Sequence, residues 1–466
     1  MNIITLITRK WSIIICLPLV GCISPPKSIV DNSIPIPEVW QAAPSSTISK
    51  LKAPCLEYFE ENTALKALIF KATEFNTDLA IASARVELAK AELKESKPNR
   101  LPTLNAQLQG GRQKINSFGP QQNIGGITFD SYTLNLGLQW DIDLWGRLKN
   151  KSQYQLSKLT SVEANLESAK ISIAAKITKL WLQVMHLKGQ HYLLSQALEA
   201  QSMITESAQE RYIKGITIAG DLLKERARKQ ALSEELYGLE MQIDQATRSL
   251  EILVGSYPSA QALAYSELPE LPESVPAGIP SSLLSNRPDI ISAERNLAST
   301  HVLVKASQKN RLPQFSLTGN LGTSSSALSN ILNSDFSVWS LGSNIAQPIL
   351  NHGKISATIK QAKAQRTEAE AYYDLAVLNA FMEVENALSN EAYLKKERDL
   401  NNLQLIQALA LLEISESEYT KGYAEFRDYL NTRINALKSE RLNLQIKHEQ
   451  LQNRINLYLA LGYSFI

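Results

Sequence analysis

The 466-residue sequence has few of the features that mark metal proteins, nucleic-acid-binding proteins and helical membrane proteins. It contains only three cysteines and five histidines, and none of them stand at metal-ligand spacing, so neither a disulfide scaffold nor a metal site is predicted. The 48 basic residues nearly balance the 46 acidic ones, which excludes the strongly basic surface that binds nucleic acid. No apolar run reaches the roughly 20 residues of a spanning helix, which excludes a polytopic helical membrane protein.

Catalytic motifs are also absent from the sequence. It contains neither a phosphate-binding loop nor a nucleophile elbow. His186 and His191 are five positions apart, so they would diverge around a helix. Asp141 and Asp143 resemble a paired-carboxylate site, but they alternate with apolar residues, which places them on one face of a strand. We therefore expect no enzymatic activity and no cofactor.

The first 21 residues have the pattern of an export signal. Arg9 and Lys10 precede an apolar stretch, residues 11–20, of signal-peptide length. The stretch ends in Leu19-Val20-Gly21-Cys22, which resembles the bacterial lipobox, where Cys22 would be lipidated and become the new N-terminus. Ile23 after the cysteine implies sorting to the outer membrane, where several acyl chains would anchor the protein stably. The alternative is a cleaved signal with an incidental cysteine.

The rest of the chain repeats itself at a nearly constant interval. Asn99-Arg100-Leu101-Pro102 recurs 211 residues later as Asn310-Arg311-Leu312-Pro313. The pattern Tyr212-x-x-Gly215-x5-Asp221 recurs 207 residues later as Tyr419-x-x-Gly422-x5-Asp428. The change of interval places four extra residues in the first copy. We therefore expect an internal duplication of one unit, which consists of a helix, a strand pair, a long helix, a turn and a second long helix.

Proline-rich stretches divide the chain. Five prolines fall between residues 258 and 280 and six between residues 24 and 54, and prolines at this density forbid continuous helix. The predicted organisation is a signal peptide (1–21), a lipidated extended segment (22–63), a first repeat (64–256), a proline-rich linker (257–282) and a second repeat (283–466).

Proline-free stretches of helix-forming composition predict unusually long helices. A helix of about 64 residues would extend roughly 95 Å, too long to fold over one compact core, so it must pack lengthwise against its neighbours. A shorter helix, ended by Pro98, is predicted from apolar residues at helical spacing. The expected helices cover residues 64–97, 149–212, 217–254, 354–420 and 424–460.

The strand pairs show a different pattern. Seven apolar residues between 132 and 144 alternate strictly with uncharged polar residues and aspartates, and residues 104–108 alternate in the same way. The second repeat shows the pattern more weakly, over residues 315–321 and 339–345. Strands of about ten residues with one apolar and one polar face are typical of transmembrane β-barrels. An antiparallel sheet half covered by helices is the alternative, and the export signal favours the barrel.

Four such strands cannot form a barrel within one chain. Lipid tolerates no open sheet edge, and single-chain barrels begin at eight strands, so several chains must contribute strands. Two chains would give a barrel filled by side chains, whereas three would give twelve strands and leave room for a conduit. The strand pattern therefore predicts an oligomer.

The chain as a whole resembles the TolC-like outer-membrane factors, specifically the lipoprotein branch that serves tripartite drug-efflux pumps. The most specific motifs are Asp141-Ile142-Asp143-Leu144-Trp145-Gly146-Arg147, Asn286-Arg287-Pro288-Asp289-Ile290 and the paired Tyr-x-x-Gly turns. The resemblance implies a mixed α and β fold. Three protomers would form a 12-stranded β-barrel, which a long α-helical barrel continues across the periplasm. It also implies docking to a periplasmic adaptor and an inner-membrane pump.

Gly215 and Gly422 each interrupt a helical pattern, as a glycine in the left-handed conformation after a helix would. Both turns are expected at the same end of the molecule. The resemblance implies that this end is the entrance, closed by links between helices, and that residues after the glycines contact the adaptor. We hypothesise that Asp221 and Asp428 contribute to the closed entrance; the alternative is ordinary solvated helix-end charges. The candidate residues are Arg211, Tyr212, Gly215, Ile216, Thr217, Asp221, Tyr419, Gly422, Tyr423 and Asp428.

The resulting hypothesis is a passive exit duct for drugs or other small molecules in the cell outer membrane. Two alternatives stay open, a duct for secreted protein and a lipid-anchored periplasmic rod without a pore. The alternating strands favour a duct, because a rod needs no segments with one polar and one apolar face. The lipobox favours drug efflux over protein secretion by analogy.

Overall fold

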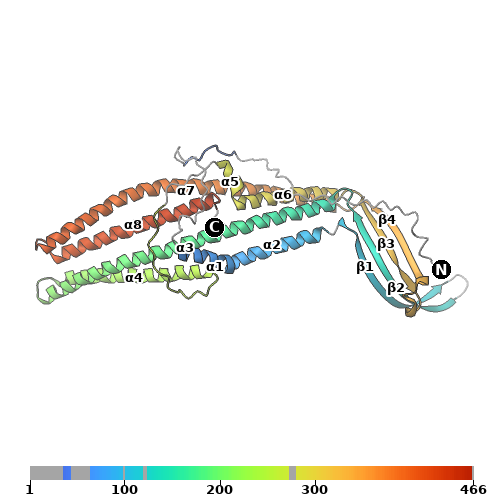
Figure 1. Cartoon of the computed structure of the whole chain (residues 1–466), viewed down its shortest axis with the longest axis horizontal. Helices are drawn as coiled ribbons and strands as arrows, with labels where there is room; N and C mark the ends of the chain where they lie inside the picture. Colours follow the sequence, from blue (N-terminus) through green and yellow to red (C-terminus); the bar gives the residue numbers. More distant parts are fainter. Residues whose placement is uncertain (1–34, 43–62, 98–99, 119–122, 272–279, 464–466) are drawn as a thin grey trace.

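The computed structural model describes residues 35–42, 63–97, 100–118, 123–271 and 280–463. The predicted signal peptide, the lipidation site Cys22 and the helix-ending Pro98 lie outside these residues. The molecule is elongated, with a long helical body and a sheet at one end (Figure 1). The helices approach the sheet end-on and cover neither of its faces, so the alternative of a sheet half covered by helices is wrong (Figure 1).

In the first half of the chain, two helices precede two strands and two long helices. These elements are α1 (Thr63–Phe75), α2 (Thr77–Ser96), β1 (Thr103–Phe118), β2 (Asn123–Ile142), α3 (Arg147–Ile213) and α4 (Ala219–Leu253). In the second half, the elements are α5 (Pro280–Asn286), α6 (Pro288–Lys309), β3 (Gln314–Ser325), the 3₁₀ turns η3 (Leu328–Asn330) and η4 (Ser334–Phe336), β4 (Ser337–Ala346), α7 (Lys354–Thr420) and α8 (Phe426–Ala460).

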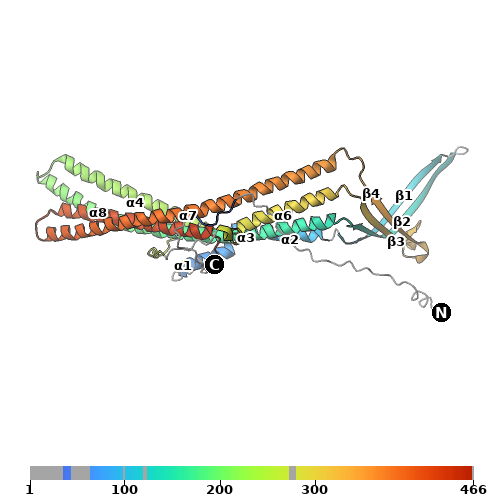
Figure 2. The same ribbon diagram turned by 90° about the horizontal axis from the view of Figure 1, so that it is seen from above.

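The long helices are present as predicted, with ends within about two residues of the expected positions. Both α3 and α7 contain 67 residues, which corresponds to roughly 100 Å each. Both α4 and α8 contain 35 residues. Each long helix folds back on the next, so the two helical hairpins lie along the body and turn at the same end, far from the sheet (Figures 1 and 2).

The prediction of one continuous helix over residues 64–97 is wrong, because the chain breaks at Asn76. This residue is buried, with 3% of its surface exposed, and it is the N-cap of α2. Its Oδ1 accepts a hydrogen bond from the Leu79 amide at 3.0 Å, while its Nδ2 donates to the Leu253 carbonyl at 2.7 Å. The same side chain therefore begins α2 and satisfies a carbonyl at the C-terminal end of α4.

The main hydrophobic core lies in the middle of the helical body, where the two halves of the chain meet. Its fully buried side chains include Leu65 on α1, Leu182 on α3 and Val384 on α7. The described part of the N-terminal segment adds Trp40, which packs edge-on against Phe381 with ring centroids 5.9 Å apart. The helices thus share one core rather than forming two separate domains.

Arg287 joins three helices at one end of this core. Its guanidinium bonds to the carboxylate of Asp289 at 2.6 and 3.0 Å, to Glu383 on α7 at 2.6 Å and to the Ala460 carbonyl of α8 at 3.0 Å. Gly462 lies against it, and a Cβ there would approach the Arg287 side chain to 2.9 Å. The motif around Arg287 therefore has a structural role, because it holds α6, α7 and α8 together.

The described strands form one antiparallel sheet in the order β1-β2-β3-β4. The predicted strands are all present, but β1 and β2, at 16 and 20 residues, are longer than the expected ten or so. Within the described part of the chain, neither β1 nor β4 has a partner on its outer edge. Among the described helices, none is both long and apolar enough to cross a membrane.

Candidate functional site

The turns between the long helices have the predicted conformation. Gly215 and Gly422 have φ angles of +72° and +80°, in the left-handed region. After α3, the Ile216 amide donates to the Arg211 carbonyl at 2.8 Å, and after α7 the Tyr423 amide donates to the Glu418 carbonyl at 2.8 Å. Both turns are therefore Schellman motifs, which explains the need for glycine at each. We call this end of the molecule, residues 201–228 and 417–430, the hairpin end.

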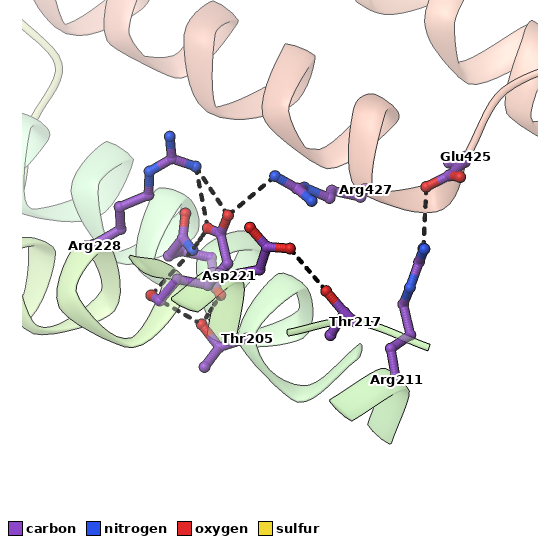
Figure 3. A network of polar contacts seen from close by, with 9 residues as sticks. Thr205, Arg211, Thr217, Asp221, Arg228, Glu425 and Arg427 are labelled. Atoms are coloured by element: carbon purple, nitrogen blue, oxygen red, sulfur yellow. Dashed lines mark hydrogen bonds and ion pairs between the residues drawn. The ribbon is translucent and has the colours of Figure 1, made fainter. Parts of the chain in front are cut away.

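Several predicted residues make contacts at the hairpin end (Figure 3). Arg211 of the first hairpin forms an ion pair of 3.2 Å with Glu425 of the second. Tyr419 packs against two aromatic rings, with centroids 5.1 Å from Phe426 and 5.7 Å from Tyr429. Tyr212, Ile216 and Tyr423 are exposed, with Tyr423 at 83%. An exposed tyrosine and isoleucine beside the turns are available for a partner protein.

The two aspartates of the hypothesis lie in equivalent places. Asp221 is in the first turn of α4 and Asp428 in the first turn of α8, where a carboxylate interacts favourably with the helix dipole. Asp221 also accepts a hydrogen bond of 2.9 Å from the Thr217 hydroxyl of its own turn (Figure 3). Within the described chain, this contact fixes the local turn; the role of both aspartates at a closed entrance stays a prediction.

The most extensive polar link between the hairpins is centred on Glu225, which the sequence analysis did not single out. Only 1% of its surface is exposed. Its carboxylate accepts hydrogen bonds from Arg228 of α4 at 3.1 Å, from Gln201 of α3 at 2.9 Å and from Arg427 of α8 at 3.2 Å. Figure 3 labels Arg228 and Arg427, and the dashed lines from their guanidiniums end on this carboxylate. Glu225 thus connects three helices and both hairpins. In the sequence it is one acidic residue among many on a charged helix, so no signal identified it.

The electrostatics of the two inter-hairpin links differ. Arg211 and Glu425 are 45% and 63% exposed, so solvent screens their ion pair and it contributes about 0–1 kcal/mol. The Glu225 side chain is 2% exposed, and removing a partner from a buried charge typically costs several kcal/mol. Because both guanidiniums on Glu225 are 45% exposed, the cost here is smaller than for a fully buried pair. Of the two polar links, the one at Glu225 therefore contributes more to holding the hairpins together, beside the buried apolar contact of Ala200 and Ile204 with Leu430.

The sheet at the other end has two chemically different faces. The register pairs even-numbered residues of β1 with even-numbered residues of β2, and so defines which side chains share a face. The apolar face carries Leu104, Leu108, Leu134, Leu136, Leu138, Trp140, Phe315, Leu317, Leu321, Trp339, Leu341 and Ile345. The polar face carries Asn105, Gln107, Gln109, Thr133, Asn135, Ser316, Thr318, Asn320 and Ser340.

Hydrogen bonds run across the polar face. Asn135 donates to Asn320 at 3.1 Å, and Asn320 donates to Ser340 at 3.2 Å, which links β2, β3 and β4 through side chains alone. Gly137 leaves room for this row of hydrogen-bonded side chains, because a Cβ at position 137 would lie 3.3 Å from the Asn320 side-chain oxygen. Uncharged amides and hydroxyls on one face can form hydrogen bonds with water, whereas the apolar side chains of the opposite face cannot.

Aromatic side chains lie at the edge of the sheet next to the helices. The Trp140 indole donates to the Arg100 carbonyl at 3.1 Å, and the Trp145 indole donates to the Pro313 carbonyl at 2.7 Å. Asp143 accepts hydrogen bonds from the amides of Leu148 and Lys149, at 3.0 and 2.7 Å. Asp143 therefore caps the N-terminus of α3, a structural role that the sequence analysis did not identify.

The structure also brings together two histidines that lie far apart in the sequence. His186 of α3 and His448 of α8 stack with ring centroids 4.5 Å apart and planes 13° from parallel. Burial lowers the pKa of His448 to about 4, with a smaller contribution from His186, and burial also lowers the pKa of His186. Stacked rings cannot direct their nitrogens at one ion. Among the described residues, no group of three or more acidic, histidine or cysteine side chains could hold a metal.

Comparison with known proteins places this geometry in context. The chain matches the family described as outer membrane efflux protein over residues 68–256 and 279–463. It is 27% identical over 459 residues to the pyoverdine export outer membrane protein OpmQ of Pseudomonas aeruginosa, and this match covers 96% of this chain and 95% of that protein. It is 29% identical over 422 residues to the solvent efflux pump outer membrane protein SrpC of Pseudomonas putida, and this match covers 88% of this chain and 87% of that protein. The fold is similar to that of the CmeC outer membrane channel of Campylobacter jejuni, with a TM-score of 0.85, 23% identity and 95% of each chain covered.

Proposed function

The chain belongs to the outer membrane efflux protein family, and on this premise we propose that three copies form the exit duct of a tripartite efflux pump. The family predicted from the sequence motifs is confirmed, and it is a family of efflux proteins rather than enzymes. The protein is an outer-membrane efflux channel that extends into the periplasm, and it works with a periplasmic adaptor and an inner-membrane pump.

The proposal depends chiefly on the two-faced sheet with its two free edges. In lipid, every backbone donor and acceptor must be satisfied, so the edges of β1 and β4 have to pair with neighbouring copies. Three copies supply twelve strands, which close into a barrel wide enough for a conduit. The face with Leu104 and Leu136 then contacts lipid, and the face with Asn135 and Asn320 lines the lumen.

The long helices continue the duct away from the membrane. We place the hairpin end at the entrance, where Arg211, Tyr212, Gly215, Ile216 and Thr217 of the first turn lie near the adaptor. The second turn contributes Tyr419, Gly422 and Tyr423, whose exposure supports a role in docking. Asp221 and Asp428 contribute to the closed state through contacts between copies.

The two halves of the chain derive from an internal duplication. The equal lengths of α3 and α7, and of α4 and α8, support the repeats at residues 64–256 and 283–466, with a linker over 257–282. The lipobox supports cleavage after residue 21 and lipidation of Cys22, so that residues 22–63 connect the anchor to the body. Trp40 and its neighbours hold this segment on α7: the amides of Gln41 and Ala42 donate to the Glu385 carboxylate at 2.8 and 2.9 Å.

Substrates pass through the duct passively, because the pump supplies the driving force. The relatives named above export pyoverdine and solvents, and we infer that this chain likewise conducts small molecules. The polar lumen face supports this inference, because amide and hydroxyl groups permit passage without binding one solute tightly.

Reconstitution tests the proposal. Purified protein should migrate as a trimer that heat dissociates, and it should conduct ions in planar lipid bilayers. A rod without a pore would give no conductance, and a single-copy protein in detergent would contradict the trimer. As a further test, the substitution Glu225→Gln, which weakens the hairpin end, should increase the conductance of each channel.

A further inference from the structure

The hairpin formed by β1 and β2 extends beyond the rest of the sheet. Pairing between β2 and β3 ends at Tyr132 and Ser325, whereas pairing between β1 and β2 continues from Gly111 and Ser131 to Phe118 and Asn123. The two strands stand free of β3 and β4 at the end of the molecule opposite the hairpin end (Figure 2). We call residues 111–118 and 123–131 the outer hairpin.

The two faces of the sheet exchange character where the outer hairpin begins. The even-numbered face, apolar lower down, here carries Arg112 and Lys114 opposite Asp130 and Thr128, with an Arg112–Asp130 ion pair of 3.5 Å. The odd-numbered face, polar lower down, here carries Gln113 and the apolar Ile115, Ile127 and Phe129, which are 50%, 56% and 41% exposed. Ile115 and Ile127 are direct cross-strand partners, so these side chains form one cluster.

The exchange marks the point at which the strands leave the lipid. It falls at Gly110 and Tyr132, where the tyrosine ring covers the glycine and a Cβ on Gly110 would lie 3.1 Å from it. Tyrosine is typical of the membrane–water interface, and charged side chains on the outward face are acceptable only above the hydrocarbon. The apolar cluster therefore lies outside the membrane, on the side that faces the axis of the barrel.

We propose that the apolar faces of the outer hairpins from three copies pack against one another over the exit of the duct. This inference rests on the proposed trimeric barrel. An isolated two-stranded hairpin is marginally stable in water, and an exposed apolar face on it needs a covering surface. Edge pairing between copies sets the three hairpins on one ring with these faces turned inward, so the natural partner of each cluster is its copy.

The dimensions permit this contact. From Gly111 to Ile115, the last residue of the apolar cluster on β1, four residue steps extend about 14 Å at 3.4 Å per residue. A twelve-stranded barrel with strands 4.8 Å apart and tilted by about 40° has a radius of about 12 Å. The outer hairpins are therefore long enough to reach the axis. Because each cluster contains few side chains, the contact narrows the exit without sealing it permanently.

Site-specific crosslinking tests the contact. In a Cys55→Ser background, Ile127→Cys places a thiol on the apolar face, and Thr128→Cys places one on the opposite face one residue away. Intact cells are treated with a short bis-maleimide, and the chains are separated on a denaturing gel. A trimer holds three thiols, so one reagent joins two chains. We expect a dimer band from Ile127→Cys and none from Thr128→Cys.

The outcomes separate this inference from the proposed function. If Ile127→Cys forms normal, conducting trimers without a dimer band, or if both variants crosslink equally, the hairpin contact is wrong and the channel stands. If neither the natural protein nor the Cys55→Ser parent forms a trimer, the proposed function itself fails. As a second measurement, Phe129→Ser should raise single-channel conductance while Phe129→Leu should not. Unchanged conductance in Phe129→Ser would also overturn the contact.

Discussion

Replacing Glu225 with glutamine should loosen the hairpin end more than any other single charge removal there. Glutamine keeps the volume of the side chain and its contact with Gln201, but it leaves Arg228 and Arg427 without their buried carboxylate. Two unit charges 4 Å apart interact by roughly 4 kcal/mol at an effective dielectric constant of 20. Both guanidiniums are 45% exposed, and water replaces much of this energy, so we expect a net loss of about 2 kcal/mol.

Hydrogen exchange measures this loss directly. If local opening of the hairpin end becomes easier by about 2 kcal/mol, its amides should exchange about 30-fold faster, while amides in the core around Leu182 keep their rates. Glu425→Gln is the matched control, because it removes the exposed pair with Arg211. A change of at most about fivefold is expected there, corresponding to 1 kcal/mol.

A double-mutant cycle assigns the effect to the link between hairpins. Glu225→Gln and Arg427→Gln should each accelerate exchange, and their combination should be less than additive, since both remove the same contact. Equal effects of Glu225→Gln and Glu425→Gln, or additivity in the cycle, would refute the reasoning that burial makes Glu225 the stronger of the two polar links.

The remaining predictions concern the sheet, the histidine pair and the buried cap. Asn320→Lys should keep the trimer and shift ion selectivity toward anions, whereas Ser343→Lys, on the apolar face, should lower trimer yield through a cost of about 2–4 kcal/mol per chain in lipid; the reverse result would refute the assignment of the faces. The folded-state pKa of His448 is about 4, below the unfolded 6.5, so the unfolded chain binds more protons in this range and stability falls as pH falls from 6.5 to about 4. Between pH 7 and pH 5 the natural protein should therefore lose about 2 kcal/mol more stability in thermal unfolding than His448→Gln does, and equal pH slopes in the two proteins would contradict it. Asn76→Ala should lower the free energy of unfolding by about 1–3 kcal/mol, because it removes the cap of α2 and the bond to Leu253; a change below 0.5 kcal/mol in chemical denaturation would argue against that role.

The sequence alone determined the features that depend on local periodicity. Period-two alternation over residues 132–144 placed β2 and its two faces, and the absence of proline over residues 149–212 and 354–420 determined the long helices. Gly215 and Gly422 marked the turns, because only glycine adopts the left-handed conformation of a Schellman motif at little cost. These signals are local: each depends on the conformation of a few neighbouring residues.

The tertiary structure alone decided which distant side chains meet. No sequence pattern relates Glu225 to Arg427. The packing of both α4 and α8 against α3 nevertheless brings the two side chains within 3.2 Å of each other, although they are 202 residues apart in the chain. His186 and His448 stack for the same reason. The apolar spacing of residues 64–97 concealed the break at Asn76, because the side-chain amide of Asn76 donates to a carbonyl 177 residues away. Such contacts depend on the relative rotation and register of packed helices, which many side chains determine together and no local pattern encodes.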